Sequence, residues 1–359
     1  MPAADVVRLN QVQVLGSHNS YHLAPEQAVL DGVAAFSPDL ATGLDYTHVP
    51  LTEQLDTYGI RQFELDVYPD PDGGRFSQHP ALALVGLPVD SGDPALDEPG
   101  FKVLHVPDID FRSTCSTFVA CLTEIATWSE AHPDHLPIMI LVEAKSESLD
   151  DVAAASGVDL STLGIDLTDV LPWTPSLFDD LQSEILSVFD RDRIITPDDV
   201  RGSHATLEEA VLAGDAWPAL DDARGHVLFA LVDGGDTETA YIGDTPSLEG
   251  KLLFTSSTPG RPDAAFLRMD DPTEDPGAIE DAVAAGYLVR TRADVPEPPQ
   301  ANARNGDTSM RDAAIASGAQ YVSTDYYVAD PDLASGYVVT LASRCDPVNA
   351  PPACELGDG

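Results

Sequence analysis

The sequence predicts a closed (β/α)8 barrel, and three observations lead to this fold class. Eight short apolar runs, rich in β-branched residues, recur along the 359-residue chain. Helical stretches lie between several of them, and nearly continuous apolar strands that alternate with helices are typical of a parallel sheet covered on both faces. The alternative is an open doubly wound sheet, but no G-x-G-x-x-G motif follows the first run to support dinucleotide binding.

The elements follow in chain order. Strands are expected over 12–15, 62–67, 102–106, 138–142, 227–232, 265–269, 287–291 and 320–323. Helices are expected over 117–132, 177–189, 277–285 and 311–317. The first of these helices illustrates the pattern, because its apolar side chains recur at helical spacing: Phe118, Cys121, Leu122, Ile125 and Trp128.

Two segments, about 70–100 and 147–175, are rich in Pro, Gly, Asp and Ser, and we interpret them as loop insertions within the barrel. We expect the whole chain, 1–359, to form one catalytic domain with an irregular C-terminal extension. At 43% hydrophobic residues the chain can build a substantial core.

The charge balance excludes one class of partner. The chain has 61 acidic and 18 basic residues, a formal net charge of -43, whereas nucleic-acid binding needs clustered Lys and Arg. An Asp-rich, Lys-poor surface stays hydrated in concentrated salt and is typical of halophilic proteins, although a GC-rich genome with acidic secreted proteins gives a similar composition. No apolar run approaches the roughly 20 residues that span a bilayer, and we expect a soluble monomer.

The four cysteines form two close pairs, Cys115 with Cys121 and Cys345 with Cys354. This arrangement predicts two local disulfides and therefore a secreted, extracellular protein, because disulfides persist in oxidising compartments. The first five residues lack the basic and apolar regions of a signal peptide, so a leader would not be part of this sequence.

Polar residues follow four successive predicted strands. The first is followed by Ser17-His18-Asn19-Ser20, the second contains Glu64 and Asp66, the third ends at His105, and the fourth is followed by Glu143-Ala144-Lys145. Because the carboxyl ends of barrel strands converge on one mouth, we expect these side chains to meet there.

The acidic members of this group predict a site for a hard divalent cation. Glu64 and Asp66 are two residues apart on a strand and therefore share a face. With Glu143 and the amide oxygen of Asn19 they form an oxygen-only ligand set, which suits Ca²⁺ or Mg²⁺ better than zinc. Buried without such an ion, the carboxylates would repel one another.

Two histidines beside such an ion indicate phosphodiester cleavage. His18 and His105 could move protons and stabilise charge on a phosphoryl group. A lone histidine is more often structural, and we interpret His22, His48, His132, His135, His204 and His226 in that way.

At this point the sequence resembles the phosphatidylinositol-specific phospholipases C, in particular the secreted Ca²⁺-dependent bacterial type. The matching stretches are Gly16-Ser17-His18-Asn19-Ser20-Tyr21, Glu64-Leu65-Asp66-Val67, Lys102-Val103-Leu104-His105, Asp108-Ile109-Asp110-Phe111-Arg112-Ser113-Thr114-Cys115 and Glu143-Ala144-Lys145. They cover roughly residues 10 to 150. Farther on, Gly318 to Tyr326 is similar to the last barrel strand of this superfamily.

The resemblance implies a role for each matching residue. His18 would stabilise the phosphoryl oxygen, and His105 would protonate the departing glyceride oxygen. The Ca²⁺ ligands would be Asn19, Glu64, Asp66 and Glu143, with Mg²⁺ as an alternative ion. Glu64 or Glu143 would accept the proton of the inositol 2-hydroxyl, so that diacylglycerol and a cyclic inositol phosphate result.

Some assignments stay open. His79 lies 15 residues after Glu64, the short spacing seen in eukaryotic members of the family, and is the alternative to His105 as second histidine. Lys145, Arg292 and Tyr326 are expected to contact substrate. Asp294 and Asp325 should also face the mouth, whereas Asp233 and Asp270 are interpreted as structural.

The substrate also has alternatives. A chain this acidic would be repelled by a phosphoinositide membrane at low salt, and it offers no basic amphipathic helix, although peripheral membrane contact stays open. A glycerophosphodiester or another soluble polyol phosphodiester is therefore a second candidate. A third, of a different class, is an inactive Ca²⁺-dependent module that binds a head group.

Overall fold

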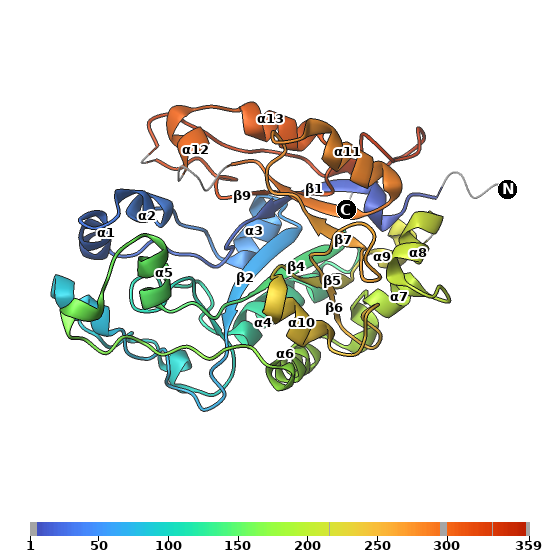
Figure 1. Cartoon of the computed structure of the whole chain (residues 1–359). Helices are drawn as coiled ribbons and strands as arrows, with labels where there is room; N and C mark the ends of the chain where they lie inside the picture. Colours follow the sequence, from blue (N-terminus) through green and yellow to red (C-terminus); the bar gives the residue numbers. More distant parts are fainter. Residues whose placement is uncertain (1–5, 215, 295–299, 332, 357–359) are drawn as a thin grey trace.

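The computed structural model describes residues 6–214, 216–294, 300–331 and 333–356, and its core is a barrel of eight parallel strands (Figure 1). These are β1 (Val12–Ser17), β2 (Gln62–Tyr68), β4 (Ile138–Ala144), β5 (Val227–Leu231), β6 (Leu253–Thr255), β7 (Phe266–Arg268), β8 (Leu288–Arg292) and β9 (Tyr321–Thr324). Two short strands lie outside the barrel, β3 (Lys102–Val103) and β10 (Arg344–Cys345).

The barrel closes on itself. Its strands are hydrogen-bonded in the order β6-β5-β4-β2-β1-β9-β8-β7, and a parallel bridge between Ser256 and Phe266 joins the two ends. The sequence prediction of a (β/α)8 barrel is thus confirmed, and the open doubly wound alternative is wrong.

One expected strand is not part of the barrel, and one barrel strand was missed. Within 102–106 only Lys102 and Val103 are extended, and they pair antiparallel with the end of β2, Val67 opposite Val103. The barrel strand that takes its place is β6, the fifth barrel strand in chain order, which has only three residues, Leu253–Thr255. The apolar side chains Val103, Leu104 and Val106 are buried in the core, and periodicity alone does not distinguish such a segment from a barrel strand.

Helices cover the outside of the barrel. The α-helices are α1 (Gln27–Ala34), α2 (Pro38–Gly43), α3 (Leu51–Thr57), α4 (Phe118–Ala131), α5 (Leu149–Ala155), α6 (Pro175–Val188), α7 (Pro197–Arg201), α8 (Leu207–Ala213), α9 (Leu220–Ala223), α10 (Gly235–Ile242), α11 (Pro276–Ala285), α12 (Ala301–Asn305) and α13 (Ser309–Ala316). Short 3-10 turns are η2 (Leu9–Gln11), η3 (Pro80–Val85), η4 (Pro94–Asp97), η5 (Ser161–Leu163) and η6 (Arg191–Arg193). The four helices expected from the sequence correspond to α4, α6, α11 and α13.

Local chemistry explains where these helices begin. The hydroxyl of Thr117 accepts a hydrogen bond from the backbone N–H of Ala120 and caps α4. Thr174 caps α6 in the same way, with Pro175 at the first helical position. The apolar face of α4 then joins the barrel core, where Phe118, Cys121, Leu122 and Ile125 are fully buried.

The two expected insertions contain short helices. Segment 70–100 holds η3 and η4, and segment 147–175 holds α5 and η5. Figure 1 shows α1, α2 and α5 gathered at one side of the barrel, and residues of α1, η3 and α5 share a small apolar core of their own. The mouth of the barrel is therefore walled on that side by segments that are not barrel helices.

The C-terminal extension packs at the opposite end of the barrel from the mouth. β10 pairs antiparallel with the start of β1, with Val12 opposite Cys345. Both disulfides expected from the sequence are present, Cys115 with Cys121 and Cys345 with Cys354. Among the described helices, none has the length and apolar character needed to cross a bilayer.

Candidate active site

The turn after β1 places a histidine and an amide at the mouth of the barrel. His18 follows the last residue of β1, and its backbone N–H donates to the carbonyl of Thr324 on the neighbouring strand. Asn19 adopts φ 42°, in the left-handed region that Asn accepts more readily than most residues. The Nδ2 of Asn19 donates to the hydroxyl of Tyr46 at 3.1 Å, which orients the amide and leaves its oxygen for another partner.

Strand alternation brings the carboxylates together. In β2 the side chains of Phe63, Leu65 and Val67 belong to the apolar core, so Glu64 and Asp66 point to the other face. Asp66 lies opposite Glu143 in the parallel pairing of β2 with β4. One oxygen from each of Glu64, Asp66 and Glu143 lies within 4.8 Å of the others.

Two members of the carboxylate cluster (Glu64, Asp66 and Glu143) have shifted pKa values, Asp66 and Glu143. The pKa of Asp66 is raised well above its ordinary value, first because the group is buried and then because Glu143 and Glu64 repel its charge. Burial would also raise the pKa of Glu143, but the ammonium of Lys145 outweighs this effect and holds it below the ordinary value. The negative charge of the carboxylate cluster therefore favours a nearby cation, and the ammonium of Lys145 supplies part of the positive charge.

Two basic side chains hold the edges of the cluster. Nζ of Lys145 lies 3.0 Å from Oε1 of Glu143 and 3.8 Å from Oδ2 of Asp66. Arg290, from β8, donates to Oε2 of Glu64 at 2.6 Å and also pairs with Asp270. The sequence prediction of a mouth-facing Lys145 agrees with this placement, but Lys145 contacts the cluster and does not line the open cleft.

The remaining oxygens fit a hard cation. Among the described residues, neither carboxylate oxygen of Asp66 has a hydrogen-bond partner, and neither does Oδ1 of Asn19. Buried oxygen acceptors without a donor are costly, and their chemistry matches the ligands that Ca²⁺ prefers. Glu64 keeps Oε1 for this role, because Arg290 occupies its other oxygen.

His18 is held by a carboxylate from the last barrel strand. Its Nδ1 lies 2.9 Å from Oδ1 of Asp325, and its Nε2 lies 3.8 Å from Oε1 of Glu64. Because a carboxylate accepts only, Nδ1 carries a hydrogen and Nε2 faces the cluster. Arg292 donates to the other oxygen of Asp325 at 2.8 Å and to Asp294 at 3.1 Å.

His105 has a matching carboxylate. Its Nδ1 lies 2.7 Å from Oδ2 of Asp110, and the same carboxylate contacts Nε2 of His22 at 2.8 Å. Burial lowers the pKa of His105 from its ordinary value of 6.5, although Asp110 acts in the opposite direction. The two imidazoles keep the pKa of Asp110 at about 2, even though burial alone would raise it.

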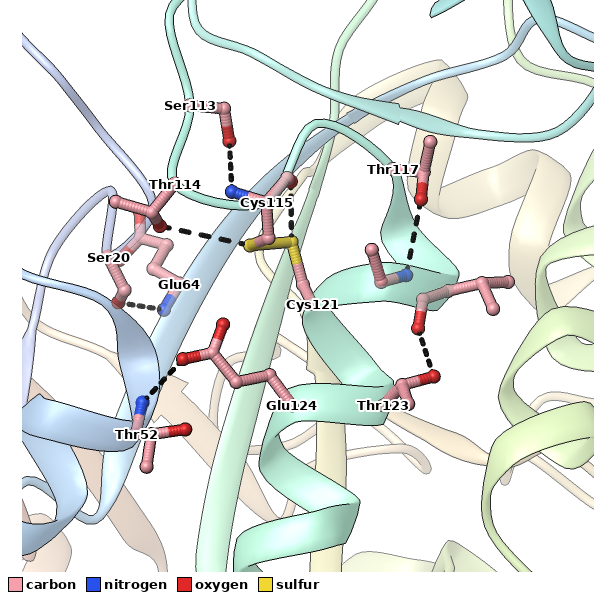
Figure 2. The surroundings of a disulfide bond; sticks show 12 residues. Ser20, Thr52, Glu64, Ser113, Thr114, Cys115, Thr117, Cys121, Thr123 and Glu124 are labelled. Carbon is pink, nitrogen blue, oxygen red and sulfur yellow. Dashed lines mark hydrogen bonds between the residues drawn. A yellow bond between two sulfur atoms is a disulfide. The ribbon is translucent and has the colours of Figure 1, made fainter. Parts of the chain in front are cut away.

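The loop with His105 and Asp110 is anchored beyond them by the first disulfide. Figure 2 shows Cys115 joined to Cys121 at the start of α4, with Ser20, in the turn after β1, and Glu64, in β2, nearby. Ser20 accepts from the backbone N–H of Glu64 at 2.9 Å, and Thr114 donates to the carbonyl of Tyr21 at 2.8 Å. The disulfide thus ties the end of this loop to α4, and the bond from Thr114 to Tyr21 ties it to the turn after β1.

A cleft of about 600 Å³ joins the two histidines. Its lining includes six residues with predicted roles: His18, Asn19, His105, Glu143, Arg292 and Tyr326. Only 1% of the surface of Tyr326 is exposed. Glu64 and Asp66 lie beneath this lining, buried at 3% and 1% exposure. The cleft therefore brings a cation site and two imidazoles to one place.

His79, the alternative second histidine, lies elsewhere. It is fully buried, its ring stacks on Phe111 at 3.5 Å between centroids, and it does not belong to the lining of the cleft. The spacing that suggested His79 is thus met by a core residue, while His105 reaches the cleft.

Sequence reasoning gave no assigned role to three residues that hold this site together. Asp110 holds His105, Asp325 holds His18, and Arg290 holds Glu64. The sequence contains a feature that could have pointed to each of these residues. Asp110 lies in a stretch that resembles the family, Asp325 follows the last strand, and Arg290 is two residues from Arg292 on one strand.

Comparison with solved structures identifies relatives of this fold. A phosphoinositol-specific phospholipase C from *Pseudomonas* sp., described as calcium-dependent and as an apo form in complex with myoinositol, has 18% identity and a TM-score of 0.55, covering 96% of this chain and 97% of its own. A Ca²⁺-dependent phosphatidylinositol-specific phospholipase C from *Streptomyces antibioticus* has 20% identity and a TM-score of 0.52, covering 89% and 95%. No curated protein sequence matches the chain.

A sequence-family model gives the assignment. The model described as "Phosphoinositide phospholipase C, Ca2+-dependent" matches residues 7–351, nearly the whole chain. Calcium is the cofactor of that family, in agreement with the oxygen-rich ligand set predicted from the sequence. The chain is therefore an enzyme that belongs to the Ca²⁺-dependent phosphoinositide phospholipase C family.

Proposed function

We propose that this enzyme cleaves phosphatidylinositol to diacylglycerol and a cyclic inositol phosphate. The observation that carries the proposal is the arrangement of His18 and His105 around one cleft, above three carboxylates whose oxygens lie within 4.8 Å of one another. The relatives described as acting on phosphoinositol compounds share the fold, and one of them binds myoinositol.

Asn19, Glu64, Asp66 and Glu143 would hold the Ca²⁺ ion. The ion would supply positive charge for the phosphoryl oxygens and lower the proton affinity of the attacking hydroxyl. Arg290 and Lys145 keep the ligand oxygens in place, because each of them already pairs with one member of the carboxylate cluster.

The first proton transfer takes place at the cation side of the cleft. The inositol 2-hydroxyl oxygen attacks phosphorus, and a carboxylate of the cluster accepts its proton. Either Glu64 or Glu143 would act as this base: Glu143 lines the cleft, whereas Glu64 lies beneath it with Oε2 paired to Arg290. His18, oriented by Asp325, donates to a phosphoryl oxygen as negative charge develops there.

The second proton transfer releases the lipid. His105 gives its proton to the glyceride oxygen as the phosphorus–oxygen bond breaks, so the leaving group departs as a neutral alcohol. Asp110 fixes the ring through Nδ1 and leaves Nε2 for this transfer. Asp110 favours the protonated ring, and burial, which lowers the pKa of His105, makes that protonated ring a stronger acid.

Arg292 and Tyr326 line the cleft and are proposed to contact the substrate. Lys145 does not line the cleft, and we propose that it positions Glu143 instead. We also propose that the protein is secreted, since both disulfides are formed and such bonds persist in oxidising compartments.

The test is ³¹P NMR of the products formed from phosphatidylinositol and from glycerophosphoinositol, each with Ca²⁺ and with chelator. We expect a Ca²⁺-dependent signal of a five-membered cyclic phosphate from phosphatidylinositol. A glycerophosphodiesterase would release acyclic phosphate from the soluble substrate alone, and an inactive binding module would turn over neither compound. Either result contradicts the proposal.

A further inference from the structure

A second cavity, of about 320 Å³, lies beside the catalytic cleft and is almost entirely apolar. We name it the apolar cavity, and its wall is formed by α1, α2, η3, α5 and residues 156–167. Figure 1 shows α1, α2 and α5 together at one side of the barrel. None of the lining side chains carries a charge, which is unusual in a chain with 61 acidic residues.

The apolar cavity adjoins the catalytic cleft. Ser37, Leu40 and Ser156 belong to the linings of both. The two spaces therefore meet at these three residues, within reach of one bound molecule.

The apolar cavity adjoins the side of the cleft from which the leaving group departs. Ile109 lines the cavity, and its neighbour Asp110 holds His105. On the other side of Ile109, the carboxylate of Asp108 accepts hydrogen bonds from the backbone N–H and the hydroxyl of Thr168, at 2.8 and 3.0 Å. The loop that carries the proposed general acid thus also forms part of the cavity wall.

Because the protein is strongly negative, its affinity for an anionic lipid must come from apolar contacts. At -43 the protein is repelled by an anionic bilayer, so electrostatic attraction cannot hold it there. At the edge of the cavity two apolar side chains are largely exposed, Phe36 at 63% and Leu84 at 52%. Apolar surface of this kind, next to a cleft, marks a binding site.

We propose that the apolar cavity binds one acyl chain of the glycerolipid substrate, drawn out of its aggregate, while the head group occupies the cleft. This inference rests on the proposed function, because it takes the leaving group to be a glyceride. Burial of a methylene group in an apolar site favours binding by roughly fourfold, so chain length should control catalytic efficiency.

The test measures kcat/KM for phosphatidylinositols with two acyl chains of four, six or eight carbons, all kept below their critical micelle concentrations. Glycerophosphoinositol serves as the substrate without acyl chains. Between four and six carbons we expect kcat/KM to rise about tenfold, less than the roughly sixteenfold limit for two buried methylenes. If turnover is measurable but kcat/KM does not change with chain length, the acyl-chain proposal is wrong and the proposed function still holds.

Two variants place a charge in opposite walls of the apolar cavity. Val85→Asp lies at the end of η3 and Leu163→Asp lies in η5, and both native side chains are partly buried. Each should remove most of the chain-length effect and leave the rate on glycerophosphoinositol, which has no acyl chain, unchanged. Leu186→Asp is the matched control, because Leu186 is 47% exposed on α6 and lies outside both linings.

Every outcome of this experiment bears on the proposal. A chain-length effect that persists in both cavity variants contradicts the acyl-chain proposal. A chain-length effect seen only when the lipids form micelles also contradicts it, because this face would then be a membrane-insertion surface. If neither variant folds, the dependence of kcat/KM on chain length in the unmodified enzyme still tests the acyl-chain proposal. Absence of turnover on all substrates would instead overturn the proposed function.

Discussion

Nδ1 of His18 lies 2.9 Å from Oδ1 of Asp325, although 307 residues separate them along the chain. The contact exists because β1 and β9 are neighbours in the closed barrel and both residues follow the ends of their strands. Burial alone would raise the pKa of Asp325, but His18 and Arg292 hold it well below its usual range. The carboxylate is therefore ionised and fixes the orientation of the imidazole.

We predict that Asp325→Asn lowers kcat by on the order of a hundredfold, because the imidazole loses its charged partner and its fixed tautomer. KM should change much less, since the ligands of the cation stay in place. Steady-state kinetics on a monomeric substrate measure both constants. The exposed Asp312→Asn serves as control, and equal kcat values for the two variants would contradict a positioning role.

His18→Ala and His105→Ala should each lower turnover by on the order of 10² to 10⁴. Circular dichroism and thermal unfolding should show a folded protein in both cases, because both side chains are partly exposed in the cleft. His132→Ala, at a surface histidine that is 47% exposed, is the matched control. A near-normal rate in either cleft variant would remove that residue from the mechanism.

Asp66→Asn should weaken Ca²⁺ binding and raise the stability of the Ca²⁺-free protein. Burial and the nearby Glu143 raise the pKa of Asp66, so an ionised carboxylate there costs folding free energy at neutral pH. Calorimetric titration with Ca²⁺ and thermal unfolding with and without chelator measure both effects. For the native protein, Ca²⁺ at a hundred times Kd should add about 2.7 kcal/mol, and no difference between the two conditions would refute the site.

Asp346→Asn should stabilise the protein above pH 6. Burial raises the pKa of Asp346 to about 6 from an ordinary value of 3.8, so the native carboxyl contributes stability below pH 4 and loses it as the pH rises through 6. The difference corresponds to about 3 kcal/mol. An asparagine oxygen can still accept from the N–H groups of Val348 and Asn349. Urea unfolding of both proteins at pH 4 and pH 8 tests this, and a difference that does not grow with pH contradicts it.

Removal of the Cys115–Cys121 disulfide should cost about 2 kcal/mol of stability, as expected for a short closed loop. It should also lower kcat, because the loop with His105 and Asp110 loses an anchor (Figure 2). The double variant Cys345→Ser with Cys354→Ser is the control, since that disulfide closes a similar loop at the other end of the barrel. Equal activity of the two double variants would show that the first disulfide is structural only.

The sequence by itself determined the barrel and much of the proposed site. Alternation along a strand is a local property, so the shared face of Glu64 and Asp66 could be predicted from their spacing. Placement of His18 and Asn19 at the mouth needed only the end of the first strand, and the disulfides needed only close spacing of cysteines. The short strand β6 and the antiparallel pairing of β3 escaped prediction, because runs of two or three residues carry no clear period.

Only the tertiary structure shows which side chains hold the proposed catalytic and metal-binding residues in position. The contacts of His18 with Asp325, His105 with Asp110, and Glu64 with Arg290 depend on strand order, loop path and side-chain rotamers. None of these follows from periodicity. His18 and Glu64 meet partners that are 307 and 226 residues away only when the barrel closes, and the contact of His105 with Asp110 depends on the path of the loop that holds both. Tertiary structure likewise places His105 in the cleft and His79 in the core, since burial against Phe111 is a property of packing and not of spacing.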